Sequence, residues 1–172
     1  EAELGGGVLS SLSELVFGKV PPSKDGFFYH FMKMRTAARA GASEISVVDT
    51  ALFLLGALTA GEYFGGDVKV LADKIYQRVQ WNKFFDAKTK SFYLAWSPEK
   101  GFSSGRWDYF TDETLLIHIL AAGSAASKVP GDSFYGFRRE KGRFGDGDDF
   151  IYSWSGALFT HQYAAAWLDL RG

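Results

Sequence analysis

The sequence contains no cysteine. It can therefore form no disulfide and no thiolate metal site, and the redox compartment stays open, because cysteine-free proteins are stable in either environment. The histidines His30, His118 and His161 lack the close spacing of a zinc-binding helix motif, so no metal is expected. No cofactor is predicted either, since the sequence has no phosphate-binding loop and no dinucleotide-binding glycine motif in a βαβ context.

An excess of one charge and long apolar runs are also lacking. The formal net charge is −1, and no dense run of Lys and Arg supplies the positive surface that nucleic-acid binders need. No apolar run reaches the length of about 18 residues that suggests a membrane span, and no signal-peptide pattern opens the sequence. We therefore expect neither nucleic acid nor membrane as a partner, and any export signal would lie upstream of Glu1.

Aromatic residues are what the sequence has in excess. Its 172 residues suit one domain with a sizeable core, and 47% apolar and 23% charged residues are ordinary for a soluble globular chain. Aromatic residues reach 17%, and many stand beside Gly, Asp and Ser in predicted loops. Each ring is either part of the core or a stacking platform for a flat ligand face. With nucleic acid disfavoured, a sugar is the better hypothesis for that ligand.

Hydrophobic periodicity predicts several helices. The strongest covers Val47–Phe64, opened by Ser46 with Asp49 at the spacing of a capping box and closed by two glycines. The next runs from Val68 to about Val79 with Asp67 as its cap, and the short connection makes the pair antiparallel. Weaker patterns predict an amphipathic helix around 8–16 ended by 20–23, a helix at about 112–122 and a last helix at 155–169. Residues 27–32 fit a strand or a helix, because periodicity does not separate the two in so short a run, and a helix entrance is the interpretation we adopt.

Three segments do not show helical periodicity. Residues 81–96 read as a small hairpin, and 97–109 as a loop rich in Gly and Ser that carries aromatic residues. Residues 123–154 are too many for an ordinary connection, so they form either a functional loop or small β structure.

Acidic residues among aromatic ones are typical of glycoside hydrolases, whose reaction needs a protonated acid and a second carboxylate as base or nucleophile. Structural roles compete with this function, because carboxylates also cap helices, complement helix dipoles and form ion pairs. Residue types alone do not choose the pair. The candidates are Glu44, Asp49, Glu99, Asp108, Asp112, Glu113 and Asp169.

Several blocks then match one family in order and spacing. They are residues 26–31 (GFFYHF), 43–52 (SEISVVDTAL), 56–60 (GALTA), 96–102 (WSPEKGF), 120–124 (LAAGS), 158–163 (LFTHQY) and 167–172 (WLDLRG), together with Trp107, Tyr109 and Glu113. The chain resembles the glucoamylase-like domain of bacterial endo-β-1,2-glucanases and cyclic β-1,2-glucan synthases from about Gly26 to its end.

The resemblance implies an all-α fold, an (α/α)6 toroid in which two rings of helices enclose a cleft at one end. It implies an inverting endo-β-1,2-glucanase with two carboxylates, an oligosaccharide or polysaccharide as partner, and a periplasmic or secreted bacterial protein. Three alternatives stay open: a glucan transferase module of a cyclic β-1,2-glucan synthase, a non-catalytic carbohydrate-binding fragment, and a glycosidase for another linkage.

The resemblance also assigns roles residue by residue. Glu113 matches the general acid, although a helix start favours its ionised form, so that role needs burial or a nearby like charge. Glu44 and Asp49 match an early acidic pair that lines the cleft. The remaining predicted substrate-binding residues are Tyr29, His30, Trp96, Glu99, Phe102, Trp107, Tyr109, His161, Gln162 and Tyr163. The aromatic ones among them would stack on sugar, and His161, Gln162 and Tyr163 would supply hydrogen bonds.

The sequence departs from the family in two ways. A toroid of twelve helices takes on the order of 350 to 400 residues, so residues 1–172 are expected to form a single partial domain, the N-terminal half. The missing half, as a separate segment or chain, would then be a partner that could supply the general base, and the isolated chain is expected to be inactive. Ala164-Ala165-Ala166 stands where relatives have a polar residue and histidine, which suggests altered substrate contacts.

Overall fold

The computed structural model describes residues 2–17, 24–153 and 155–171. Within these residues the longest elements are the helices α1 (Ala2–Phe17), α2 (Val47–Phe64), α3 (Gly66–Arg78) and α4 (Asp112–Gly123). The strands are short: β1 (Ile45–Ser46), β2 (Phe85–Asp86), β3 (Ser91–Tyr93), β4 (Ala95–Ser97), β5 (Gly101–Phe102), β6 (Arg106–Trp107), β7 (Lys141–Gly142) and β8 (Phe150–Ile151). Short 3₁₀ turns cover Trp81–Lys83, Gly131–Tyr135, Leu158–His161 and Ala164–Ala166.

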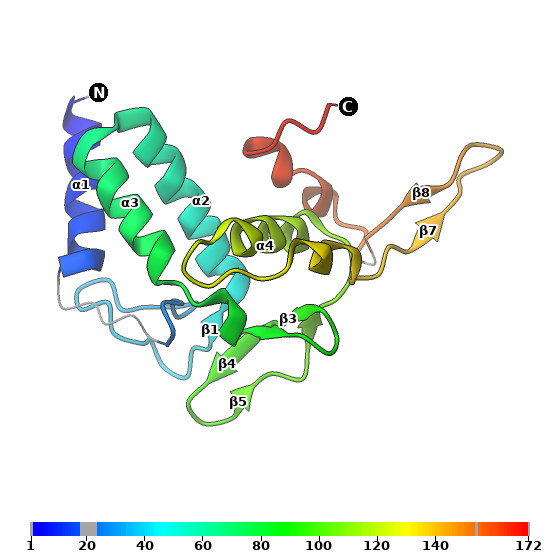
Figure 1. The fold of residues 1–172 in the computed structure, drawn as a ribbon, viewed down its shortest axis with the longest axis horizontal. Helices are drawn as coiled ribbons and strands as arrows, with labels where there is room; N and C mark the ends of the chain where they lie inside the picture. The colour runs from blue at the N-terminus through cyan, green and yellow to red at the C-terminus, as the bar shows by residue number, and fades with distance from the viewer. Residues whose placement is uncertain (1, 18–23, 154, 172) are drawn as a thin grey trace.

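Helices α2 and α3 form the predicted antiparallel pair, with α1 alongside α3 (Figure 1). Gly65 joins them with φ at 66°, a left-handed conformation that glycine adopts without strain. Gly61 allows α2 and α3 to approach closely, because a Cβ there would lie 3.2 Å from the Cα of Lys69. The predicted cap at Asp67 is wrong: Gly65 occupies the N-cap position, and Asp67 lies inside the first turn of α3.

Three other predicted helices are present in the structure, although α1 begins at Ala2, six residues before its predicted start. Val47–Phe64 is confirmed to the residue, with Ser46 as N-cap accepting a hydrogen bond from the Asp49 amide at 3.3 Å. The helices predicted around 8–16 and 112–122 are confirmed as α1 and α4. The helix stop predicted at 20–23 lies outside the described residues. By length and a mean hydropathy of 1.3, α2 could cross a membrane, a property that it shares with core helices of soluble proteins.

The core lies where α2, α3 and α4 meet the small sheets. Its largest fully buried side chains are Trp81, Phe27, Phe84, Phe92, Ile45, Leu54, Ile75, Leu116, Ile117, Val47, Val79 and Val129. The rings of Phe27 and Phe84 lie 4.1 Å apart by their centroids, and the edge of Trp81 meets Phe27 at 5.3 Å. Many aromatic residues therefore belong to the core, the first of the two roles that the composition allowed for each ring.

Small sheets complete the fold, so the prediction of an all-α protein with one hairpin is too simple. In one sheet the strand order is β1-β4-β5, in another β2-β3-β6, and β7 pairs with β8 alone. The hairpin predicted within 81–96 is confirmed by the pairing of β2 with β3. The segment 97–109, predicted as a loop, contributes β5 and β6. Of the two alternatives for 123–154, the described residues form small β structure, the pair β7 and β8.

Two predicted helices are absent from the described residues. Residues 27–32 form bridges and a bend, because the backbone of 28–30 pairs with that of 44–46; for example, the His30 amide donates to the Glu44 carbonyl at 2.8 Å. Residues 155–169 form 3₁₀ turns and bends instead of a helix. Ala164 is buried and Tyr163, Trp167 and Leu168 pack against the core, but Leu158 and Phe159 are 71% and 48% exposed, so only part of the predicted apolar face is covered.

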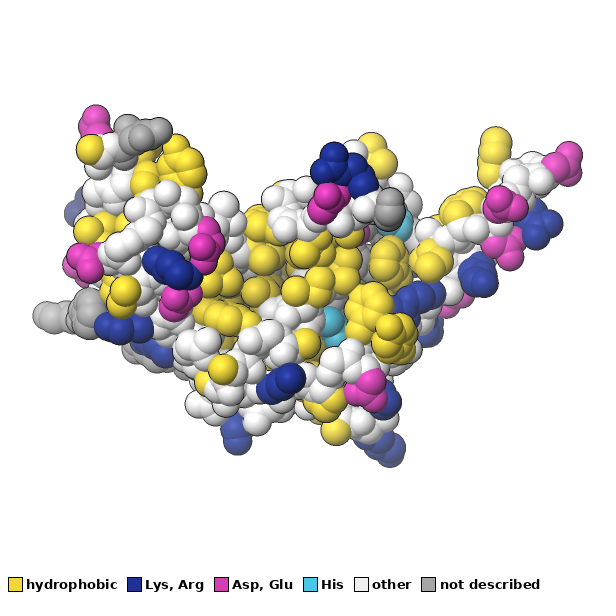
Figure 2. Space-filling view, turned by 45° about the horizontal axis from the view of Figure 1, so that its top comes forward, with side chains coloured by type: hydrophobic (Ala, Val, Ile, Leu, Met, Phe, Trp, Pro, Cys, Tyr) yellow, Lys and Arg dark blue, Asp and Glu magenta, His cyan; other side chains and the backbone are white. Residues whose placement is uncertain are grey.

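One face of the molecule is hollow. Figure 2 shows hydrophobic side chains gathered across this hollow, between the helices at the left and the C-terminal segment. Charged side chains stand mainly around its margin.

Candidate functional site

The candidate site lies at the beginning of two helices, α2 and α4. Both starts are fixed by side-chain caps, Ser46 for α2 and Thr111 for α4, where the Thr114 amide donates to the Thr111 hydroxyl at 3.1 Å. Asp49 lies in the first turn of α2 and Glu113 in the first turn of α4. The negative charge of Asp49 contributes to the raised pKa of Glu113, so the two predicted site residues are near enough to interact electrostatically.

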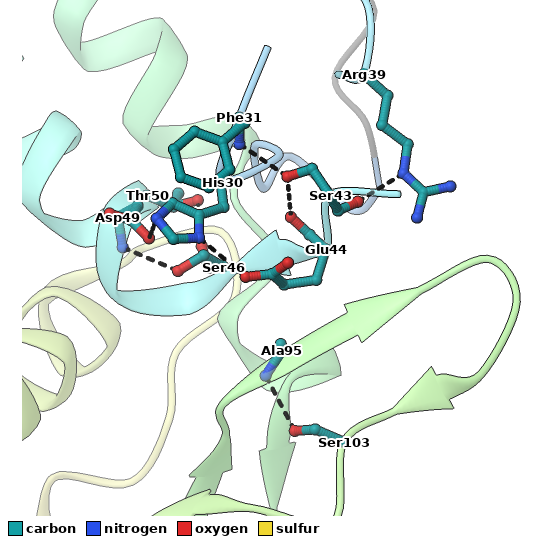
Figure 3. A network of polar contacts seen from close by, with 10 residues as sticks. All are labelled: His30, Phe31, Arg39, Ser43, Glu44, Ser46, Asp49, Thr50, Ala95 and Ser103. Carbon is teal, nitrogen blue, oxygen red and sulfur yellow. Dashed lines mark hydrogen bonds and ion pairs between the residues drawn. The ribbon is translucent and has the colours of Figure 1, made fainter. Parts of the chain in front are cut away.

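His30 connects the two early acidic residues. Its Nδ1 lies 2.9 Å from Glu44 Oε1, and its Nε2 lies 3.7 Å from Asp49 Oδ2 (Figure 3). The imidazole also stacks on the ring of Phe31, with centroids 4.1 Å apart. The three polar side chains are between 38% and 43% exposed, so they remain accessible to a ligand. The structure thus brings together His30, Glu44 and Asp49, which are distant in the sequence.

Backbone pairing holds this cluster in place. The Ser46 amide donates to the Phe28 carbonyl at 3.2 Å, and the Phe28 amide donates to the Thr50 hydroxyl at 3.0 Å. Gly26, at φ 86°, starts the loop where a Cβ would collide with the backbone of Arg78. The loop from Gly26 to Glu44 is therefore anchored at both ends, and the imidazole of His30 lies beside the first turn of α2.

The two glutamates of the site have opposite electrostatic environments. Burial, followed by the charges of Asp49 and Asp112, raises the pKa of Glu113. Hydrogen bonds from its own backbone and from His30 lower the pKa of Glu44. The pKa of Glu113 is thus shifted in the direction that a general acid requires, and the pKa of Glu44 in the direction that suits an ionised carboxylate. Such a divergence separates acid and base roles in glycosidases.

Asp112 has a structural role beside Glu113. It is 3% exposed, and its Oδ2 accepts a hydrogen bond from the Ala164 amide at 2.8 Å. This bond ties the C-terminal segment to the start of α4. Asp112 therefore has a structural role at the start of α4, one of the alternatives to catalysis that the sequence left open.

Glu99 is held by an arginine. Arg39 donates to its two carboxylate oxygens at 2.5 and 2.8 Å, and to the Ser43 carbonyl at 2.5 Å. The Arg39 hydrogen bond is the main cause that lowers the pKa of Glu99 to about 2. The guanidinium also lies 5.3 Å from the ring centre of Tyr29. Glu99 and Tyr29 thus join a clamp between the 26–44 loop and the β4–β5 turn, beside the His30 cluster.

The predicted stacking residues differ in exposure. Trp96 is half-buried on β4, with Lys24 Nζ 5.0 Å above its ring. Phe102 is 38% exposed and stacks on Tyr93 at 4.3 Å between centroids. Trp107 is only 8% exposed and belongs to the core, which favours the core interpretation for this ring. No sequence motif marked Tyr93, the ring on which Phe102 stacks, which also lies 3.6 Å from the Arg106 guanidinium.

The C-terminal residues approach the start of α4 from another side. His161 Nε2 accepts a hydrogen bond from the Ser153 amide at 3.2 Å, and its ring stacks on Phe110 at 5.9 Å. Gln162 is exposed, whereas Tyr163 is half-buried against Phe159 and the core. The ring of Tyr109 lies 6.4 Å from that of Trp107.

Among the described residues no group of three His, Cys, Asp or Glu side chains is arranged to hold a metal ion.

Comparisons with known proteins agree with the resemblance read from the sequence. Residues 105–172 match the Glycoamylase family model, described as "Putative glucoamylase". Among solved structures, a "putative glucoamylase" from Bacteroides uniformis superposes with a TM-score of 0.71 at 19% identity, over 80% of this chain and 35% of that protein. A comparison with curated proteins finds no match.

Two β-1,2-glucanases share the fold as well. The β-1,2-glucanase from Parabacteroides distasonis has a TM-score of 0.59 at 17% identity, over 77% of this chain and 24% of that one. The endo-β-1,2-glucanase from Chitinophaga pinensis, solved with sophorotriose and glucose, has a TM-score of 0.58 at 18% identity, over 91% and 45%. The chain thus has the fold of these proteins and spans less than half of their length.

Proposed function

We propose that this chain, which has the fold of the glucoamylase-like proteins, is part of a glycoside hydrolase that cleaves internal β-1,2 bonds of a glucan with inversion. In this proposal residues 1–172 form a single partial domain, one part of an (α/α)6 toroid. The starts of α2 and α4 line its cleft. The periplasmic or secreted location that the resemblance implies belongs to the same proposal.

The observation that carries the proposal is the link between two groups of carboxylates at the starts of α2 and α4: Asp49 lies beside His30 and Glu44, and its charge also acts on Glu113. The pKa of Glu113 is raised by burial and by neighbouring carboxylates, the shift that donation of a proton to the leaving glycosidic oxygen requires. The lowered pKa of Glu44 keeps a charged acceptor for sugar hydroxyls or a water molecule. The like charge of Asp49 contributes to the raised pKa of Glu113.

The residues then have distinct roles. Protonated Glu113 donates its proton to the glycosidic oxygen as the bond to the anomeric carbon breaks. A water molecule attacks that carbon from the opposite face and gives its proton to a carboxylate base, which inverts the configuration. Glu44 and Asp49, held by His30, accept hydrogen bonds from sugar hydroxyls or orient that water. Trp96 and Phe102 offer ring faces beside the cluster.

The decisive experiment replaces Glu113 by Gln in the full-length protein. The release of oligosaccharides from linear β-1,2-glucan should fall by about 10²- to 10⁴-fold, the usual contribution of a general acid. Glu62→Gln is a matched control, because Glu62 is exposed near the far end of α2 and pairs with Lys69. Undiminished turnover in the Glu113→Gln variant would show that Glu113 is not the general acid.

Product analysis tests the reaction type. Hydrolysis predicts linear oligosaccharides whose newly formed reducing end has the α configuration, detectable by proton NMR immediately after cleavage. Cyclic or elongated glucans would instead show a transferase, and an initial β product would contradict inversion.

A further inference from the structure

A pocket lies at the root of the β7–β8 hairpin, which stands away from the body of the molecule (Figure 1). Its volume is about 260 Å³, and it is lined by Tyr109, Phe110, Arg138, Glu140 and Tyr152. None of these residues is part of the His30 cluster. Only Tyr109 among them was singled out from the sequence as a possible sugar contact.

The backbone around the pocket is preformed. The Phe110 amide donates to the Arg138 carbonyl, and the Arg138 amide donates to the Asp108 carbonyl, both at 2.8 Å. On the other side the Tyr152 amide donates to the Glu140 carbonyl at 3.0 Å. The three lining segments are therefore hydrogen-bonded to one another, and a ligand would find the pocket built rather than having to order it.

Glycine places the principal ring of the pocket. A Cβ at Gly142 would lie 3.2 Å from the Tyr152 ring and 3.3 Å from the Phe150 ring, tighter than ordinary contacts. With hydrogen in that place, both rings lie against the β7 strand. Tyr152 nevertheless remains 42% exposed, so part of its ring is available to a ligand.

The charges of the pocket are balanced. Arg138 lies 3.8 Å from Glu140 and 3.5 Å from Asp108, and all three side chains are between 45% and 63% exposed. A cation matched by adjacent carboxylates does not select an anion such as a phosphate. Arg138 supplies hydrogen-bond donors and Glu140 acceptors beside aromatic rings, which suits a neutral, hydroxyl-rich ring.

The pocket is also close to the proposed acid. Phe110 precedes Glu113 by three residues, so their Cα atoms lie within about 11 Å, the reach of three extended residues. His161, from the C-terminal segment, stacks on Phe110, which lines the pocket. One oligosaccharide could therefore contact both places.

We propose that this hairpin-root pocket is an accessory saccharide subsite that binds an additional glucosyl unit of the chain held at Glu113. Tyr152 provides the stacking face, and Arg138 and Glu140 bind hydroxyl groups. The inference rests on the proposed function for the identity of the sugar. It adds a determinant of chain-length preference that lies outside the carboxylate cluster.

The test measures binding by calorimetry with sophorotriose and with a β-1,2-linked glucohexaose, using Glu113→Gln to prevent turnover. In that background Tyr152→Ala should weaken hexaose binding by roughly five- to tenfold, as expected for loss of one ring contact, and should affect the triose less. Tyr152→Phe should stay within about twofold, because the ring is kept. Tyr63→Ala, at a tyrosine 67% exposed on α2, is the matched control.

The outcomes separate the two proposals. Hexaose affinity unchanged in Tyr152→Ala, with wild-type binding intact, overturns the subsite and leaves the proposed function standing. No binding of either oligosaccharide by the parent protein overturns the proposed function, and the subsite with it. An equal loss in Tyr152→Ala and Tyr63→Ala would show a general structural effect and would also overturn the subsite.

Discussion

The segment from Phe27 to Ala121 and the segment after α4 contain the same kinds of apolar residue, yet they bury them differently. The first holds nearly all of the hydrophobic core, including Trp81, Phe84 and Ile117, which are fully buried. The second contributes Val129 and Ala164 to that core, while Phe144 and Leu158 are 89% and 71% exposed. Apolar content alone therefore does not make a helix, because an apolar stripe stabilises a helix only when another element covers it.

The largest expected effect tests this contrast directly. Phe84→Ala should lower the free energy of unfolding by about 3 to 5 kcal/mol, because it removes a fully buried ring and leaves a cavity. Phe159→Ala, at a ring 48% exposed, should change it by no more than about 0.5 kcal/mol. Urea unfolding followed by circular dichroism measures both. Similar losses would show that the C-terminal segment is packed as firmly as the core.

The second prediction concerns His118, which joins the two segments. Its Nδ1 lies 3.0 Å from the hydroxyl of Ser133, and burial, with a smaller effect of Arg139, lowers its pKa to about 4. In the unfolded chain the pKa is about 6.5. The unfolded state therefore binds more protons between these values, so stability should fall by about 3 kcal/mol as pH drops from about 6.5 to 4.

Thermal unfolding at a series of pH values between 4 and 7 measures this dependence. His118→Leu should flatten the slope in that window. His161→Gln, at an exposed histidine, should keep it. A slope that survives in His118→Leu would assign the acid sensitivity to other groups.

A smaller effect is expected at the helix starts. Thr111→Ala removes the cap of α4 and should cost about 1 kcal/mol of stability, as should Ser46→Ala at α2. Ser155→Ala is the counterpart in the C-terminal segment, where the 3₁₀ turns Leu158–His161 and Ala164–Ala166 have no side-chain cap. It should change stability by less than about 0.5 kcal/mol. Denaturant midpoints of the three variants, compared side by side, test whether caps matter only where helices are packed.

The smallest effect is electrostatic and specific to the site. Asp49→Asn should lower the pKa of Glu113, because the Asp49 charge is one cause of its raised value. In an active full-length protein the basic limb of the pH–rate profile should move to lower pH, since the acid would lose its proton earlier. Carbon NMR of the labelled carboxyl groups measures the pKa directly. Asp73→Asn on α3 should leave the pKa of Glu113 unchanged. An unchanged pKa of Glu113 in Asp49→Asn would show that the starts of the two helices do not interact electrostatically.

Much of the helical part was predictable because its signals are local. The cap at Ser46, the apolar period of α2 and the closing glycines lie within one stretch of sequence, and the structure reproduces its bounds. The backbone pairing of 28–30 with 44–46 was not predictable, because it depends on a partner more than ten residues away. The same holds for the clamp between Arg39 and Glu99, whose members are 60 residues apart.

The candidate site was likewise only partly predictable from the sequence. Residue types and the family blocks pointed to Glu44, Asp49 and Glu113, but their sequence positions did not indicate how their charges interact. Tyr152, Arg138 and Gly142 carry no motif, and only the pairing of β7 with β8 gives them a common place.

The sequence by itself determined the main helices, the absence of thiolate chemistry and the set of acidic and aromatic residues available for a sugar. Those properties follow from local periodicity and from composition. Only the tertiary structure decided which carboxyl group has a raised pKa, because a pKa depends on burial and on charges brought near by distant segments. It also decided which apolar residues are covered, and hence that the segment after α4 forms turns and a projecting hairpin rather than another helix.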